Sequence, residues 1–511
     1  MAVNIGTKQN SKNLILNIAA FVVQFLIGFY ISPVIVGKVG ASAYGFISLA
    51  NDFVSYAGII ANVFNSVASR FIANEYYKKN ISDANVYFSS LFVTNLILSF
   101  IFCLIGTVFV WNVDHVLNVP DNLVFDVKIT FSLIFASYLV SLATNVFTTS
   151  TYVTNRTDLT GQREIIKQIL RFILILILLN FVSVRIYWVA LATLFAALIV
   201  AISNIQFTKR LTPDLKIRLK NANFKYVKIL AFSGFWMSFI NISNLLMRGL
   251  DLTIANAMIS ADAMGLLSVA RTIPNNFTSA IGTIAPIFTP VFILCFAKNK
   301  TEELVARVNK SIKAMALIFY VPVCGFLVYS RDFYTLWQND LSEKEIIAIT
   351  ALSSITVIQA LFNSTTATLA QLSVVVNKLK LPVFVSFGCG VVNICVVMIL
   401  LKTTNLGVYA IVISSTIIML LRYILFNSYY AAKILKQPVK VFLFQELKTW
   451  ATIPVIIAVC AIIKNILTVD SWFSLILSAA VAGVISYAAI AFMLFGKDCI
   501  KMTKNVLKRK K

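Results

Sequence analysis

The chain alternates long apolar runs with short polar connectors along nearly its whole length. A helix that crosses a bilayer needs about 20 apolar residues. Seven runs of that length lie in the first half, at 14–37, 45–71, 86–110, 129–151, 165–182, 186–207 and 229–258. Seven more follow at 264–296, 304–329, 346–376, 381–401, 408–430, 450–466 and 472–494. The pattern predicts an all-α integral membrane protein of about 14 transmembrane helices without a separate soluble domain.

The distribution of basic residues predicts the orientation of these helices. The chain is 59% hydrophobic and 13% charged, with a net charge of +24, whereas roughly a quarter of the residues in soluble domains are charged. With a cytoplasmic N-terminus, about 34 of the 44 Lys and Arg residues fall in cytoplasmic segments and about 7 outside, and 3 (Arg248, Arg271 and Arg422) fall within spans. This positive-inside bias predicts a multi-pass membrane protein with both termini cytoplasmic, and we expect it in the inner membrane of a bacterial cell. It explains the net charge without a nucleic-acid partner.

A short internal match predicts that the chain is a duplicated unit. The segment GASAYGFISLA at 40–50 aligns without gaps on SADAMGLLSVA at 260–270, an offset of 220 residues. Each segment joins the first span of a half to the second, so the match favours two parallel six-helix repeats. We expect a six-helix bundle at 1–208, a basic cytoplasmic linker at 209–228, a second bundle at 229–432, and two extra helices with a basic tail at 433–511.

Charged residues inside the predicted spans indicate a polar cavity. A charge at the bilayer centre costs at least ~2.5–3.5 kcal/mol, so it normally faces a partner or water. Asp52, Arg248, Asp251 and Arg271 lie in the outer parts of spans 2, 7 and 8, and Asn51 lies beside Asp52. They predict one central substrate cavity. The alternative is that Arg248 and Asp251, three residues apart, only neutralise each other.

Polar stripes and one further arginine extend this prediction. Gln359 and Asn363 belong to a polar stripe on span 10, and Asn145 belongs to a similar stripe on span 4. They predict cavity walls, although such groups can also join helices through hydrogen bonds worth about 0.6 kcal/mol each. Arg70 ends span 2 at the predicted cytoplasmic mouth. Its guanidinium suits an anionic phosphate headgroup, or the side chain only extends to the lipid headgroups.

The sequence offers little for catalysis. The single histidine, His115, lies in an outer connector, and no Walker-type or GxSxG motif is present. The seven cysteines have no metal-ligand spacing. We therefore expect a transporter rather than an enzyme, with no metal and no cofactor.

Several motifs together resemble a known family. They are Lys12-Asn13 at the start of span 1, Pro33 near its end, the segments at 40–45 and 65–73, and Asp251 followed by 263–265 and 268–271. They resemble the Wzx-like polysaccharide flippases of the multidrug/oligosaccharidyl-lipid/polysaccharide exporter superfamily. The resemblance implies two bundles around a V-shaped central cavity that opens alternately to each side. It implies flipping of undecaprenyl-diphosphate-linked oligosaccharide from the cytoplasmic to the outer leaflet, for surface polysaccharide biosynthesis.

The resemblance also assigns roles to the cavity residues. Arg248 and Arg271 would bind the diphosphate, and Asp251 and Asp52 would neutralise them or couple transport to H+ or Na+. The implied partners are the lipid-linked oligosaccharide, membrane lipids and a polysaccharide polymerase. A multidrug or toxin extruder and a lipid II flippase of the same superfamily remain as alternatives. A membrane glycan polymerase is disfavoured because the outer connectors are short.

Overall fold

A computed structural model describes residues 7–496, and these residues form helices and turns without a strand. The chain divides into two compact units, Met1–Ser268 and Val269–Lys511. The all-α fold is confirmed. The first unit includes the seventh predicted span as well as the first six. The domain limits at 208, 228 and 432 remain predictions, and the basic tail lies outside the described residues.

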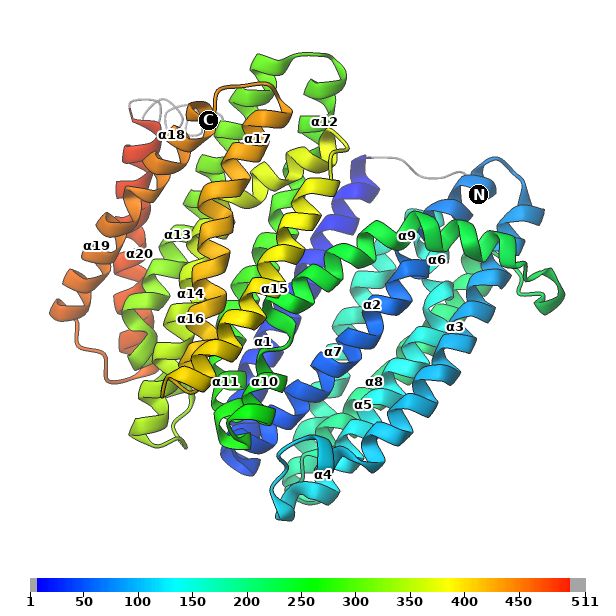
Figure 1. Ribbon diagram of the computed structural model, residues 1–511, viewed down its shortest axis with the longest axis horizontal. Coiled ribbons are helices and arrows are strands. Elements are labelled where there is room, and N and C mark those ends of the chain that lie inside the picture. The colour runs from blue at the N-terminus through cyan, green and yellow to red at the C-terminus, as the bar shows by residue number, and fades with distance from the viewer. Residues whose placement is uncertain (1–6, 497–511) are drawn as a thin grey trace. The chain divides into compact units, whose positions relative to one another are not determined.

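The first unit is built from long helices that pack side by side. Helix α1 lies against α7, α5 lies against α3 and α8, and α2 lies against α9 (Figure 1). Its elements are α1 Thr7–Val39, α2 Ala41–Tyr77, α3 Ile81–Trp111, α4 Val113–Val116, η1 Asp121–Leu123, α5 Val124–Thr144, η2 Asn145–Thr148, α6 Thr149–Val153, α7 Thr157–Phe181, α8 Tyr187–Leu211, η3 Leu219–Asn221, α9 Phe224–Asn244, η4 Leu245–Gly249 and α10 Asp251–Met258.

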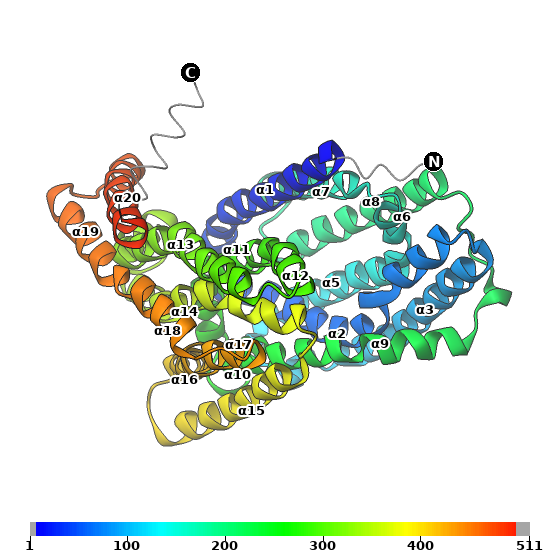
Figure 2. The ribbon, with the colours of Figure 1, turned by 90° about the horizontal axis from the view of Figure 1, so that it is seen from above.

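The second unit contains the remaining helices and begins within α11. Helix α13 packs along α14, and α19 and α20 lie together against α13 (Figure 2). The elements are α11 Ala261–Ile284, η5 Ala285–Phe288, α12 Thr289–Ala297, α13 Thr301–Trp337, α14 Glu343–Val375, α15 Lys380–Thr403, α16 Val408–Leu421, η6 Arg422–Asn427, α17 Ser428–Ile434, α18 Lys440–Trp450, α19 Thr452–Ile466 and α20 Trp472–Phe495.

Within residues 7–496, twelve helices are long and apolar enough to cross a membrane. A thirteenth is gained if Phe224–Phe235 and Ser238–Gly249, which meet at a bend of 43°, form one span. The one remaining predicted span, 165–182, corresponds to α7, which is not among these helices. It carries charged residues, including Glu164, Lys167 and Arg171. The chain is therefore a multi-pass membrane protein, and the count of fourteen remains a prediction.

The helix boundaries reproduce the internal repeat. Helix α2 covers 41–77 and the α11–α12 span covers 261–297, so both ends are displaced by 220 residues. The turns that follow contain left-handed residues at matching places, Lys79 with φ 61° and Asn299 with φ 54°. Residues other than glycine rarely adopt this backbone conformation. Its recurrence at the same offset indicates that the backbone follows the same course in the two copies. Helices α18–α20 follow the second copy and lie outside the repeat.

An apolar cluster fixes the C-terminal half of α2. Phe88 is fully buried and packs with Ile72, Val146, Leu215 and Leu230, which come from α2, η2, the loop after α8, and α9. Inside a bilayer such packing acts through close van der Waals contact, because lipid is as apolar as the side chains. The cluster therefore holds the residues at the end of α2 in a defined position.

Candidate functional site

Helices α2 and α11 cross near their N-termini with almost no space between their backbones. A Cβ atom on Gly265 would lie 2.6 Å from the carbonyl carbon of Ala41, and one on Gly45 would lie 2.9 Å from the Cα atom of Gly265. Real Cβ atoms essentially never approach so closely. Glycine at both positions is therefore what permits the crossing.

Hydrogen bonds flank the two glycines. Ser268 donates to the Ser48 hydroxyl at 2.6 Å, and Ser42 donates to the Asp262 carboxylate. Like Gly45 and Gly265, each pair is separated by 220 residues, the offset of the repeat. Copies related by a two-fold axis meet at equivalent residues on that axis. The structure thus brings equivalent residues of the two copies together where α2 meets the start of α11, at a contact that we name the axial crossing.

The opposite end of α2 borders a cavity of about 620 Å³, which we name the Arg70 pocket. Helix α2 is continuous, and 25 residues separate Gly45 from Arg70, so the two features lie about 37 Å apart along the helix. Arg70 is exposed, and no carboxylate within the described part of the chain pairs with it. The lining residues are Arg70, Ala73, Asn74, Tyr77, Tyr152, Asn155 and Thr157.

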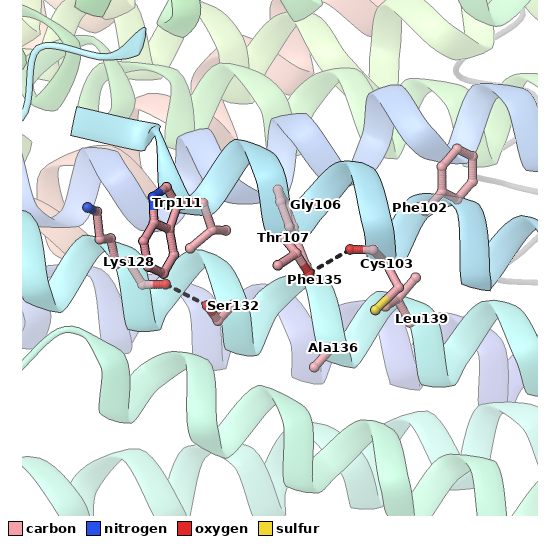
Figure 3. Close-up of a pocket in the computed structure, with 11 residues that line it drawn as sticks. Phe102, Cys103, Gly106, Thr107, Trp111, Lys128, Ser132, Phe135, Ala136 and Leu139 are labelled. Atoms are coloured by element: carbon pink, nitrogen blue, oxygen red, sulfur yellow. Dashed lines mark hydrogen bonds between the residues drawn. The ribbon is translucent and has the colours of Figure 1, made fainter. Parts of the chain in front are cut away.

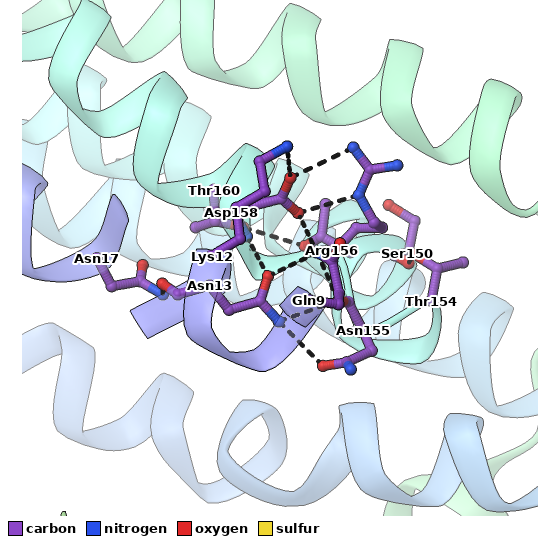
Figure 4. Close-up of polar contacts among 11 residues, drawn as sticks. Gln9, Lys12, Asn13, Asn17, Ser150, Thr154, Asn155, Arg156, Asp158 and Thr160 are labelled. Atoms are coloured by element: carbon purple, nitrogen blue, oxygen red, sulfur yellow. Dashed lines mark hydrogen bonds and ion pairs between the residues drawn. The ribbon is translucent and has the colours of Figure 1, made fainter. Parts of the chain in front are cut away.

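A buried ion cluster lies beside the Arg70 pocket (Figure 4). The Asp158 side chain is fully buried. Its Oδ2 lies 3.1 Å from Lys12 Nζ, and its Oδ1 lies 3.0 Å from Arg156 Nε. Gln9 Nε2 donates to the same carboxylate at 3.0 Å. The two basic side chains are 51% and 37% exposed. One carboxylate thus faces two cations, which leaves this edge of the pocket positively charged.

Asn13 ties α1 to the turn between α6 and α7. Its Oδ1 accepts the backbone N–H of Asp158 at 2.9 Å, and its Nδ2 donates to the carbonyl of Asn155 at 3.1 Å. Asn155 has φ 53°, so the chain reverses sharply here. An accepting side chain at a helix N-terminus satisfies an amide that otherwise lacks a partner. The Lys12-Asn13 motif therefore has a structural role at the pocket rim.

The ion cluster should make this part of the protein sensitive to acid. Burial alone would raise the pKa of Asp158, but the hydrogen bonds and positive charges of Arg156 and Lys12 lower it below its usual range. The ion cluster therefore stabilises the folded protein fully at pH values above the ordinary pKa of a carboxyl group. This stabilisation is lost as the pH falls through the lowered pKa of Asp158.

We expect Asp158→Asn to reduce thermal stability at neutral pH, because the two cations lose their counterion. Melting temperatures of wild type and variant across a pH series should converge in acid. The variant Asp340→Asn, at an exposed residue in the turn after α13, should leave the curve unchanged. A constant difference between wild type and Asp158→Asn at every pH would contradict the electrostatic explanation.

The structure brings three of the predicted cavity residues onto contacting elements in the first unit. Asp52 is half-buried on α2, one turn before Tyr56. The Tyr56 hydroxyl donates to the carbonyl of Gly249 and lies 3.1 Å from the Thr253 hydroxyl. Gly249 stands between Arg248 and Asp251, which are also half-buried. These residues therefore lie where α2 meets the start of α10.

The chain around Arg248 is irregular. Leu245–Gly249 forms a π-helical turn between α9 and α10. A second π-helical segment, Arg422–Asn427, begins with the arginine of span 12. Such π-bulges are rare in proteins as a whole, and those that occur are often found at functional sites. Sequence periodicity did not reveal either segment, because a single inserted residue barely changes an apolar pattern.

The other predicted residues lie in several environments. Asn51 is exposed and donates to the carbonyl of Ile47, and Asn145 is exposed in the 3-10 turn after α5. In the second unit, Arg271 and Asn363 are half-buried on α11 and α14. Gln359 is 3% exposed and donates to the Thr416 hydroxyl of α16 at 2.8 Å. Its role in a cavity wall, like that of the others, remains a prediction.

Two further cavities are mainly apolar. The first, of about 460 Å³, lies between α3 and α5 (Figure 3), and its one cation, Lys128, pairs with Asp114 at 2.9 Å. The second, of about 610 Å³, lies between α13, α19 and α20 in the second unit and is lined by Phe326, Trp472 and other largely apolar side chains. Both suit hydrocarbon chains better than a charged or sugar group.

Comparison with known sequences decides the family. Residues 11–296, more than half of the chain, match the family described as polysaccharide biosynthesis protein. The chain belongs to this polysaccharide biosynthesis family. One relative is an uncharacterized membrane protein, EpsK, of Bacillus subtilis (strain 168). The two are 26% identical over 498 residues, which are 97% of each chain.

Solved structures place this family member in a wider fold group. The structure of the lipid II flippase MurJ in an inward closed conformation matches with a TM-score of 0.70 and 15% identity, over 95% of this chain and 100% of the other. An inward-facing multidrug resistance MATE transporter of the MOP superfamily matches with a TM-score of 0.63 and 13% identity, over 83% and 99%. These likenesses show the shared fold.

The family match confirms the polysaccharide part of the predicted resemblance, and the fold is the one that the lipid II flippase and the MATE transporter share. The protein is a multi-pass membrane protein of the polysaccharide biosynthesis family. Sequence analysis found Arg70 but missed Asp158, whose importance depends on cations brought from α1. It also aligned 40–50 with 260–270 without predicting that the aligned residues would contact each other.

Proposed function

We propose that this protein flips undecaprenyl-diphosphate-linked oligosaccharide repeat units from the cytoplasmic to the outer leaflet of a bacterial inner membrane. The polysaccharide biosynthesis family and the flippase-like fold support this function. A cytoplasmic N-terminus, as the positive-inside bias predicts, would place the Arg70 pocket at the cytoplasmic side and the axial crossing at the outer side.

The observation that carries the proposal is the charge of the Arg70 pocket. The exposed Arg70 has no carboxylate partner among the described residues, and Lys12 and Arg156 outnumber Asp158 nearby. Arginine forks bind phosphate oxygens in a bidentate manner. Asn74, Tyr77 and Thr157 supply further polar groups to the same wall. A diphosphate headgroup therefore finds charge and hydrogen-bond donors there.

The axial crossing would close the outer side while the headgroup enters from the cytoplasm. The two backbones approach closely at Gly45 and Gly265, and two hydrogen bonds link the helices beside them. Alternating access requires such a contact to open so that cargo can leave. The hydrogen bond between the two serine hydroxyls contributes about 0.5–1.5 kcal/mol and the one to the Asp262 carboxylate about 1.5–3 kcal/mol, so both can break during each transport cycle.

The remaining groups fit the same cargo. Arg248 and Arg271 would bind the diphosphate within the membrane, and the apolar cavities would leave the polyprenyl chain in a lipid-like environment. Asp52 and Asp251 would neutralise the arginines or couple transport to H+ or Na+. A polysaccharide polymerase would accept the product on the outer side.

The test is to delete the gene and to locate the lipid-linked oligosaccharide. We expect surface polysaccharide to be lost and the intermediate to accumulate in the cytoplasmic leaflet, where externally added glycosidase cannot reach it in spheroplasts. Expression of the wild-type chain should restore both readouts. Unchanged polysaccharide combined with lower drug tolerance would show a multidrug extruder instead. Accumulation in the outer leaflet would indicate a defect in polymerisation.

A further inference from the structure

A carboxyl group without a counterion is buried in the second unit, away from the residues discussed so far. The buried residues of helix α18 are Phe442, Glu446 and Thr449. Spacings of four and three residues place them on one face of the helix. Glu446 is 0% exposed. This face packs against α13, α14 and α17, and α19 continues from the end of α18.

The Glu446 carboxylate has a single hydrogen-bond donor. The Ser428 hydroxyl at the start of α17 donates to Oε2. The second oxygen, Oε1, is buried without a hydrogen-bond partner among the described residues. An unpaired oxygen of an ionised carboxylate is costly in such a place, whereas a protonated carboxyl group carries its own donor.

A second, independent group faces the same place. Tyr320 of α13 is 0% exposed, and its hydroxyl makes no hydrogen bond of ordinary geometry within residues 7–496. The Thr365 and Thr449 side chains lie within reach of that hydroxyl, and the Glu446 carboxyl group contributes to its electrostatic environment. Tyr320 therefore adds a second buried oxygen without a hydrogen-bond partner among the described residues.

Among residues 7–496, no basic side chain forms an ion pair with this carboxyl group. The carboxyl group is buried and receives a hydrogen bond from Ser428. No acidic or basic side chain of α14, α17 or α19 in the described chain acts on it electrostatically. The titratable groups of α13 on this side are Tyr320 and, one turn later, Cys324. Lys448 on α18 itself is exposed and lies over the Phe444 ring, at 4.3 Å from its centroid.

We propose that Glu446 is a proton-binding site that controls the packing of α18. The carboxyl group holds its proton while α18 is packed against α13, α14 and α17. Release of the proton leaves a buried, uncompensated charge, which costs several kcal/mol and favours an arrangement in which α18 separates and admits water. Ser428 is a positioning residue, because its hydroxyl donates a hydrogen bond to the carboxyl group.

The position of α18 gives this site a route to the transport helices. Helix α14 carries Thr365 at the proton site and Asn363 of the predicted cavity stripe within one turn. Helix α17 follows the π-helical segment Arg422–Asn427 directly. A change in the packing of α18 therefore acts on helices of the second repeat, although α18 lies outside it.

Two measurements on the purified full-length protein in lipid nanodiscs test this proposal without any cargo. Infrared difference spectra across a pH series should show a protonated carboxyl band that disappears as the pH rises. Glu446→Gln should lack this band, and the exposed Glu302→Gln should keep it. Hydrogen exchange of 440–450, corrected for the intrinsic pH effect, should increase up to about tenfold per pH unit in wild type and stay flat in Glu446→Gln.

Three outcomes would overturn the proposal. They are a wild-type spectrum without a band assignable to Glu446, exchange in Glu446→Gln that keeps the wild-type slope, and a response that follows sodium concentration at constant pH. If Glu446→Gln does not fold, Ser428→Ala replaces it. That variant keeps the carboxyl group but removes its donor, so the midpoint should move to higher pH, and an unchanged midpoint would equally reject the site. Because no sugar or lipid carrier is present, these results are independent of the proposed cargo.

Discussion

Oxidation should abolish polysaccharide export by a protein that carries Ser48→Cys and Ser268→Cys in an otherwise cysteine-free chain. The two hydroxyl oxygens lie 2.6 Å apart across the axial crossing, so the replacing thiols meet and can form a disulfide. If transport needs this contact to separate, the covalent bond holds the protein in one state. Surface polysaccharide, measured before and after oxidation, should disappear and should return after reduction.

The single variants provide the matched controls. Ser48→Cys and Ser268→Cys alone lose at most one hydrogen bond and should export normally under oxidising conditions. All seven native cysteines must be replaced first, so that no other disulfide confuses the result. Full export by a protein shown to be cross-linked would mean that the axial crossing stays closed throughout transport, and its role as an outer gate would be wrong.

The second large effect is expected at the intramembrane arginines. Arg248→Ala or Arg271→Ala should lower polysaccharide export by ten- to a hundredfold, because a charge-assisted hydrogen bond contributes about 1.5–3 kcal/mol. Protein levels in the membrane should stay the same. Lysine at either position keeps the charge but loses the planar fork, so it should restore only part of the export.

Arg331→Ala is the control for both variants. That side chain is 60% exposed and pairs with Glu343 at 2.9 Å near the end of α13, where such surface pairs contribute little. Its loss should leave export unchanged. Normal surface polysaccharide in both Arg248→Ala and Arg271→Ala would remove these residues from the mechanism and would leave the Arg70 pocket as the only cationic site of the proposal.

Hydrophobicity predicted most of the fold because a bilayer imposes a simple length rule on each helix. The apolar runs located the long helices, and the match of 40–50 with 260–270 located the repeat. The rule was least informative where charges interrupt an apolar run. Helix α7 carries Glu164, Lys167 and Arg171, and the seventh span bends by 43°.

The candidate site was less accessible to sequence analysis, because its geometry depends on residues that are distant in the chain. Asp158 gains its importance from Lys12, 146 positions earlier, and Asn13 lies 145 positions before the residue whose amide donates to it. Gln359 fits a polar stripe in the sequence, yet its hydrogen bond goes to Thr416 on a neighbouring helix. Periodicity gives the face of a helix, but it does not give the partner opposite that face.

The pairing of equivalent residues at the axial crossing bears on how such a chain can evolve. In a homodimer of six-helix chains, a residue on the axis meets its own copy, so glycine against glycine and serine against serine are compatible with self-contact. Ser42 and Asp262 break this identity, with a donor on one side and a carboxylate on the other. Aspartate in both copies would set two like charges together. The asymmetric pair is therefore closed to a homodimer and requires a duplicated sequence, in which each copy can mutate alone.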